Sequence, residues 1–101
     1  LGAWIAHGEG RFSLPPDLSG YRVAAHYTYA AYPGNPNDSD HAVAALYSAD
    51  GRHLAIMPHI ERALYPWNWP HYPASKSDHE IGPWIIAFRE AVAWAKTHKS
   101  L

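Results

Sequence analysis

Two residues near the middle of the chain, His59 and Glu61, have the types and spacing of a catalytic base and the carboxylate that orients it. They follow an apolar run that ends at Met57. In an extended backbone alternate side chains point to the same face, so the sequence predicts that the carboxylate lies beside the imidazole. Such a pair supplies the base and its orienting group in a nucleophilic triad.

The remaining member of such a triad, a thiol or hydroxyl that attacks the substrate, is not evident. The chain contains no cysteine. It also begins at Leu1, without an initiator methionine. We therefore expect it to be a piece of a larger protein that supplies the nucleophile from another segment.

Length and composition indicate folded protein. A chain of 101 residues is long enough for one small domain. Hydrophobic residues make up 48% and aromatic residues 14%, at a net charge of only -1. This composition is far too apolar for a disordered segment. It predicts a chain that folds or belongs to something folded.

The charge balance and the lengths of the apolar runs also restrict the possible partners of the chain and its cellular location. Eight Lys and Arg against nine Asp and Glu argue against a nucleic-acid surface. No apolar run reaches the ~18 residues that cross a bilayer, and no basic segment with a following apolar core opens the chain. We expect no membrane association, no disulfide framework and a cytoplasmic location.

The elements that position the pair are expected to be strands followed by one helix. Residues 1–6 are predicted to form a short buried strand, and residues 21–29, rich in β-branched and aromatic side chains, a second one. Residues 42–48 and 53–57 are joined by a turn containing Asp-Gly, which predicts an antiparallel hairpin. Pro58 cannot donate to a sheet ladder, so the last strand should end at about Met57.

Loops and a helix account for much of the remaining sequence. Residues 33–40 consist almost wholly of turn-forming types, and residues 63–80 form an aromatic, proline-rich segment without a period, which predicts an irregular loop packed against another part of the molecule. Proline after Gly82 favours the start of a helix, and Trp84 and Phe88 lie at helical spacing in a stripe expected to be core.

Four motifs occur in the order in which one enzyme family has them. They are His-Gly-Glu-Gly-Arg at 7–11, Tyr-Pro-Gly-Asn-Pro-Asn at 32–37, Gly-Arg-His-Leu-Ala-Ile-Met-Pro-His-Ile-Glu-Arg at 51–62, and Gly-Pro-Trp at 82–84 before the helix. In these motifs the chain resembles the C-terminal end of the phosphoribosylformylglycinamidine synthase family, large purine-biosynthesis enzymes whose last domain is a class I glutamine amidotransferase. The resemblance covers essentially the whole chain.

The resemblance implies a fold and a site. The fold would be α/β: the C-terminal portion of a flavodoxin-like three-layer domain, with a mixed sheet, a β-hairpin and a C-terminal helix, residues 1–101 being a single partial domain. The family hydrolyses glutamine with a Cys-His-Glu triad whose last two members match His59 and Glu61. Its cysteine belongs to an earlier segment, so the chain alone is expected to be inactive. The segment with His7, Gly8 and Glu9 resembles the place where related amidotransferases hold glutamine through backbone groups.

The resemblance also implies partners. Glutamine would bind this domain, while formylglycinamide ribonucleotide and ATP with Mg²⁺ would bind other domains of the same ATP-dependent ligase. No metal or cofactor is expected on this chain itself.

The chain departs from the family pattern at two positions: proline is common where Ile60 stands, and glycine is common where Asp38 stands. Asp38 must then tolerate a turn geometry that is free for glycine.

Other interpretations stay open. Alone, a His-x-Glu pair can be structural or merely exposed, and Asn35 and Asn37 can serve turn geometry or contact a substrate or another domain. The chain could also belong to another class I glutaminase subunit, or to a degenerate interaction domain that has lost its nucleophile. A small metal-binding module would use the ligand set His7, His53, His59 and Glu61. The histidines lack the paired spacing that zinc sites usually show.

Overall fold

The structure is a computed structural model that describes residues 1–6, 8–76 and 80–99. The chain forms two compact units. One, here called the sheet unit, is Ile5–Pro58. The other, the helix unit, combines Leu1–Trp4 with His59–Leu101. His59 and Glu61 both belong to the helix unit, whereas Gly8 and Glu9 belong to the sheet unit.

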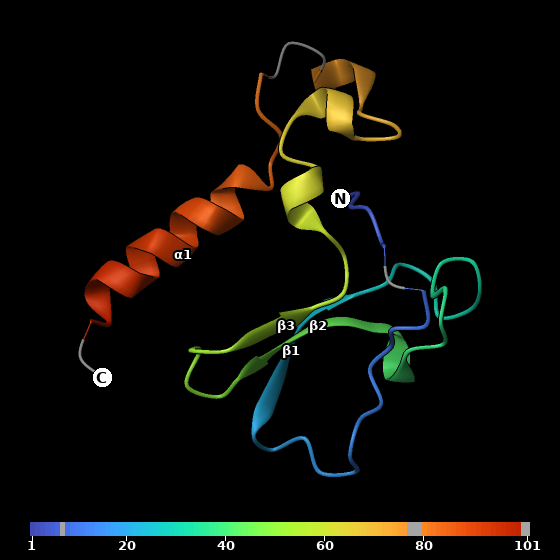
Figure 1. Cartoon of the computed structure of the whole chain (residues 1–101), viewed down its shortest axis with the longest axis vertical. Coiled ribbons are helices and arrows are strands. Elements are labelled where there is room, and N and C mark those ends of the chain that lie inside the picture. The colour runs from blue at the N-terminus through green and yellow to red at the C-terminus, as the bar shows by residue number, and fades with distance from the viewer. Residues whose placement is uncertain (7, 77–79, 100–101) are drawn as a thin grey trace. The chain divides into compact units, whose positions relative to one another are not determined.

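The sheet unit is built on three strands, β1 (Tyr21–His26), β2 (Val43–Ser48) and β3 (Leu54–Ile56). They lie side by side in the order β1-β2-β3 (Figure 1). Strands were predicted at each of these places, and the structure confirms them with somewhat shorter bounds. β3 ends before Pro58, as the missing proline N–H requires.

Both strand pairs are antiparallel, so within the described residues the sheet is not the mixed sheet that the family resemblance implied. β2 and β3 are joined by a short turn in which Gly51 has a φ of 74°, a backbone conformation that glycine adopts freely. A short turn can only reverse the chain, because parallel neighbours need a crossover of a dozen or more residues. The predicted hairpin is therefore confirmed.

The apolar core of the sheet unit lies on the middle strand. Val43 and Ala45 are each 1% exposed, and Leu46 at the centre of β2 is 9% exposed. β1 and β3, by contrast, are exposed along their whole lengths. β2 has a hydrogen-bonded strand on each side, so its backbone N–H and C=O groups are paired within the sheet. This pairing allows β2 to be buried without leaving polar backbone groups unpaired.

The helix unit contains short 3-10 turns followed by one long helix (Figure 1). The turns are η2 (Ile60–Arg62), η3 (Pro66–Asn68) and η4 (Ala74–Lys76), and the helix is α1 (Ile85–Thr97). α1 begins just after Gly82 and Pro83, which confirms the predicted helix start. None of the described helices is long and apolar enough to cross a bilayer.

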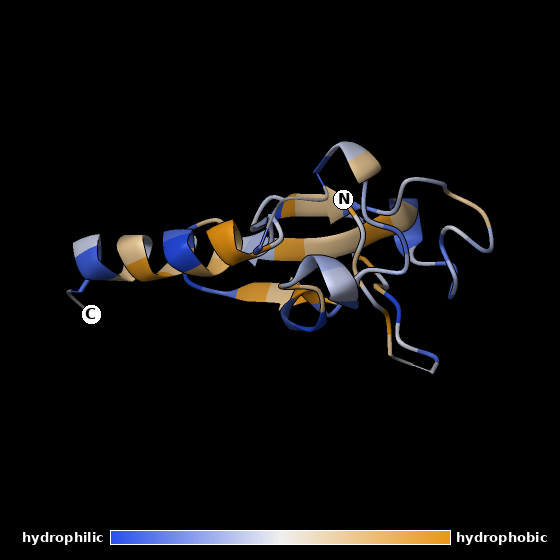
Figure 2. Cartoon of the chain, turned by 90° about the horizontal axis from the view of Figure 1, so that it is seen from above, coloured by the Kyte–Doolittle hydropathy of each residue, from blue (hydrophilic) through white to orange (hydrophobic). Residues whose placement is uncertain are grey.

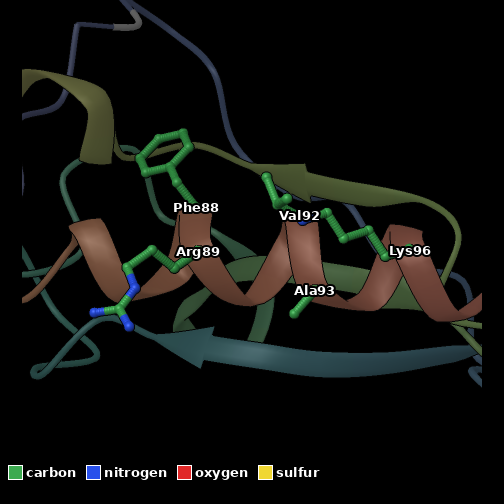
Figure 3. A pocket seen from close by; sticks show the side chains of 5 residues that line it. All are labelled: Phe88, Arg89, Val92, Ala93 and Lys96. Atoms are coloured by element: carbon green, nitrogen blue, oxygen red, sulfur yellow. The ribbon is translucent and has the colours of Figure 1, made fainter.

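The apolar stripe of α1 differs from its prediction. Figure 2 shows hydrophobic and hydrophilic bands alternating along the helix, and Figure 3 shows Phe88 and Val92 projecting from the same side of it. However, no residue of α1 is buried, and Phe88 is 40% exposed. The prediction that this stripe is core was therefore wrong for the described structure. Helical spacing tells which face is apolar, but it does not supply the surface that would cover it.

The N-terminal segment also differs from its prediction. Residues 1–6 form no strand, although Trp4 makes an isolated antiparallel bridge with His59. Leu1 is 89% exposed, so the predicted buried strand is not formed. An apolar run alone cannot distinguish a strand from a single extended contact of this kind.

Candidate active site

His59 and Glu61 contact each other directly. Nδ1 of His59 lies 2.5 Å from Oε1 of Glu61, within hydrogen-bonding distance. The two side chains are 34% and 53% exposed, so the pair is open to solvent on at least one side. The prediction that the carboxylate lies beside the imidazole is confirmed.

The backbone that brings the pair together is a turn, which corrects the extended geometry expected from the sequence. His59 is the residue immediately before η2, and Glu61 lies inside that turn. The backbone N–H of Arg62 donates to the His59 carbonyl at 3.2 Å. Pro58 ends the preceding strand, and the chain then curls at once, so the side chains meet across the start of the turn.

The N-terminal segment anchors the backbone of His59. Its N–H donates to the carbonyl of Trp4 at 2.6 Å. The indole N–H of Trp4 in turn donates to the carbonyl of Asn68 at 2.5 Å, and the indole N–H of Trp84 donates to the carbonyl of Gly2 at 2.6 Å. The segment is thus held at both ends, and it fixes the position from which the imidazole projects.

The aromatic loop supports the other end of η2. Ala63, which follows the turn, is 1% exposed, and its carbonyl accepts the indole N–H of Trp69 at 2.8 Å. The N–H of Gly82 donates to the neighbouring carbonyl of Leu64 at 2.6 Å. Sequence reasoning expected this loop to pack but missed its role beside the pair. The signal was the need of a partly buried indole N–H for an acceptor.

The hydrogen bond also indicates which ring nitrogen of His59 carries a proton. The bond donated by His59 holds the pKa of the Glu61 carboxyl below its usual range, with help from the backbone N–H of Glu61 and the charge of Arg62. An ionised carboxylate can only accept, so Nδ1 of His59 carries the donated proton. In the neutral form of such a ring Nε2 is an acceptor, which is what a general base needs.

The described residues predicted to hold glutamine, Gly8 and Glu9, belong to the sheet unit. Gly8 and Glu9 are exposed and lie in a segment of the sheet unit without helix or strand. A Cβ built on Gly8 would meet no atom within 4 Å, so the backbone there is accessible. His7, the third residue of this prediction, lies outside the described residues. The structure thus brings His59 and Glu61 together, and it leaves the backbone of Gly8 open.

The interpretation of Asn35 as a turn residue is confirmed. Asn35 is 2% exposed, and its side chain bonds to backbone groups, donating to the carbonyls of Ala30 and Ser39 and accepting from the N–H of Ser39. Asp38 has a φ of 57°, the left-handed geometry expected where the family commonly has glycine.

Residues 1–6, 8–76 and 80–99 contain no set of side chains that could bind a metal ion. Among these residues no group of three or more histidine, aspartate or glutamate side chains comes close enough to hold a metal ion. Of the four residues named for a metal-binding module, only His59 and Glu61 are shown to contact each other.

Comparison with known proteins gives the class. The profile of the CobB/CobQ-like glutamine amidotransferase domain matches residues 1–95, and the chain belongs to this family. It is 40% identical over 106 residues to the phosphoribosylformylglycinamidine synthase of Homo sapiens, covering 93% of this chain and 8% of that protein. The protein of the same name from Drosophila melanogaster is 39% identical over 109 residues, with coverages of 93% and 8%.

A plant relative gives the same result. The probable phosphoribosylformylglycinamidine synthase of Arabidopsis thaliana, named chloroplastic/mitochondrial, is 40% identical over 111 residues, which is 96% of this chain and 8% of that protein. The chain therefore spans less than a tenth of the length of these relatives. No solved structure matches it.

Proposed function

We propose that the chain is the glutamine-hydrolysing part of a phosphoribosylformylglycinamidine synthase. Relatives of that name from an insect, a plant and a human support this reading, each about 40% identical over nearly the whole chain. Residues 1–101 would form the C-terminal part of one flavodoxin-like three-layer glutaminase domain. The nucleophilic cysteine would come from an earlier segment of the same protein, since this chain has none.

The observation that carries the proposal is the hydrogen bond between His59 and Glu61, which leaves Nε2 of the ring as an acceptor. An amide is a poor electrophile, so a thiolate has to attack its carbonyl carbon. In the proposed mechanism Nε2 of His59 takes the thiol proton as sulfur bonds to that carbon. The C–N bond then breaks, and the imidazolium returns the proton to the leaving ammonia.

Deacylation would use the same groups. A water molecule gives a proton to His59 and attacks the thioester, which releases glutamate and restores the thiol. Glu61 holds the ring in one tautomer and stabilises the imidazolium each time it forms. A carboxylate with a lowered pKa stays ionised through the neutral range, so it can serve in both steps.

The ammonia would be consumed at a second site. There ATP with Mg²⁺ would activate formylglycinamide ribonucleotide, and ammonia would convert its amide to the amidine, which makes the whole protein an ATP-dependent ligase. Those substrates would bind other domains, with no cofactor on residues 1–101 and no nucleic-acid partner. A cytoplasmic location is part of the proposal, although the plant relative carries an organellar name.

A related glutaminase and a degenerate scaffold are the alternatives. Another class I glutaminase subunit would keep His59 and Glu61 and lack the synthetase domains. A degenerate interaction domain would lack the cysteine. The preceding coding sequence distinguishes these alternatives, because a Gly-x-Cys-x-Gly elbow there supports catalysis and its replacement supports the degenerate scaffold.

The decisive experiment changes the pair in the full-length protein. We expect His59→Ala to lower glutamine-dependent synthesis by a factor on the order of 10⁴ and Glu61→Ala to lower it strongly as well. Synthesis driven by added ammonia should be spared, because ammonia bypasses the glutaminase step. His53→Ala, in the sheet unit, is the control and should keep both activities. Loss of both activities together in the His59 variant would show that the pair is structural.

A further inference from the structure

The segment that follows Gly8 has no helix or strand of its own, and a distant loop supplies its hydrogen-bond partners. Nδ2 of Asn37 donates to the carbonyl of Gly10 at 2.9 Å. The N–H of Phe12 donates to Oγ of Ser39 at 3.0 Å, and the N–H of Asp40 donates to the carbonyl of Phe12 at 3.0 Å. Oδ2 of Asp40 accepts the N–H of Leu14 at 2.8 Å. The guanidinium of Arg11 also donates to the carbonyl of Asp38, so loop 37–40 contacts the segment at residues 10, 11, 12 and 14.

This loop is itself rigidly anchored. Ser39 is 4% exposed, and its hydroxyl donates to the carbonyl of Val43 at the start of β2, at 2.7 Å. The side chain of the buried Asn35 bonds both the N–H and the carbonyl of Ser39, each at 2.9 Å. Buried polar groups that are satisfied in this way define a single local arrangement.

The backbone of the loop is held in costly conformations. Asp38, His41 and Ala42 have φ values of 57°, 53° and 56°. For residues other than glycine the left-handed region costs roughly 1–2 kcal/mol each. Such strain persists only where the surroundings over-determine it, and it clusters at functional sites. The anchored loop therefore does more than close a connection between β1 and β2.

We infer that Asn37 is a positioning residue for glutamine: through the Gly10 carbonyl it holds the preceding residues Gly8 and Glu9 in the shape in which their backbone groups bind the substrate. The inference rests on the proposed function and on the family resemblance that assigns Gly8 and Glu9 to glutamine, and it adds a residue that neither the triad nor the predicted glutamine segment contains. Gly8 has no side chain, and a Cβ there would meet nothing within 4 Å, so a ligand can approach this backbone closely.

Asn37 is also the member of the loop that is best suited to a test. It is only half-buried, and its side chain acts on the segment directly. Ser39 is less suitable, because its hydroxyl is bonded to β2 and its loss would disturb the sheet. If Asn37 orients a segment that binds glutamine, its loss should weaken that binding equally in the ground state and in the transition state. Such a change raises KM and leaves kcat nearly unchanged.

The experiment measures glutamine-dependent and ammonia-dependent synthesis in the full-length protein. Asn37→Ala removes the side chain, and Asn37→Asp keeps its shape while losing the donor to Gly10. We expect each to raise the KM for glutamine about 2–13-fold, the effect of one lost hydrogen bond of ordinary strength, with kcat and the ammonia-dependent rate unchanged. Asp17→Ala is the matched control, because it deletes an isosteric side chain that is hydrogen-bonded to Ser19 in its own loop. It should leave the KM unchanged.

Each other outcome decides against the inference. An unchanged KM in both Asn37 variants overturns it while leaving the proposed function intact. A parallel fall of the glutamine-dependent and ammonia-dependent rates, with a lower melting temperature, shows a purely structural role and overturns it too. If the wild-type protein hydrolyses no glutamine, or if His59→Ala leaves hydrolysis unaffected, then the proposed function fails and the inference falls with it.

Discussion

The sheet unit and the helix unit are stabilised in different ways. In the sheet unit, β2 is buried from Val43 to Leu46, and the polar side chains of Asn35 and Ser39 are buried and bonded beside it. In the helix unit, no residue of α1 is buried. Its turns are held instead by single hydrogen bonds from indole N–H groups, such as the one from Trp69 to Ala63. The sheet unit therefore depends mainly on the buried side chains of β2, whereas the helix unit depends more on hydrogen bonds around its turns, so the two should respond differently to substitution.

The largest expected difference is between an apolar residue of β2 and one of α1. Leu46→Ala should lower the free energy of unfolding by about 2–5 kcal/mol, because it leaves a cavity in a buried strand. Phe88→Ala should lower the free energy of unfolding much less, because that residue is 40% exposed and its side chain buries less apolar area. Hydrogen exchange on peptides from the two units, in the full-length protein, measures both. Equal losses would mean that another surface covers the apolar face of α1.

Two glycines test the directed contacts of the helix unit. A Cβ at Gly82 would lie 2.9 Å from the carbonyl oxygen of Leu64, whereas a Cβ at Gly20 in the sheet unit would meet nothing within 4 Å. Gly82→Ala should therefore cost about 1–3 kcal/mol, since backbone has to move. Gly20→Ala should be neutral or slightly stabilising, because it restricts the unfolded chain. Thermal unfolding of the two variants checks this, and a harmless Gly82→Ala would show that the loop around η2 adapts easily.

The smallest effect concerns the strained backbone of the sheet unit. Asp38→Val should lower the free energy of unfolding by about 1–2 kcal/mol, because a β-branched residue fits the left-handed region poorly. Asp38→Gly should change it much less, since relief of strain is offset by the added freedom of the unfolded chain. Denaturant titration of both variants makes the comparison. Equal stabilities would show that the buried Asn35 and Ser39 do not enforce this φ.

Much of the local structure could be predicted from the sequence. The Asp-Gly turn predicted the hairpin of β2 and β3, and Gly82 with Pro83 predicted the start of α1. The contact of His59 with Glu61 was predicted correctly but for the wrong reason, since a turn rather than an extended strand makes it. The failures were residues 1–6 and the stripe of α1, where an apolar pattern was taken to imply burial. An apolar pattern gives a preference for burial, and a neighbouring surface has to satisfy it.

The hairpin, the helix and the pair of groups that could do chemistry follow from the sequence alone, because they depend on residues only a few positions apart. The groups that hold these elements in place become known only from the folded chain. Trp84 bonds Gly2 across 82 positions of the chain, and Asn37 bonds Gly10 across 27. Every residue has a backbone carbonyl, so the sequence does not show which carbonyl accepts a hydrogen bond from a distant indole or amide N–H. Folding of the chain selects these acceptors, because each buried donor needs an acceptor within hydrogen-bonding distance.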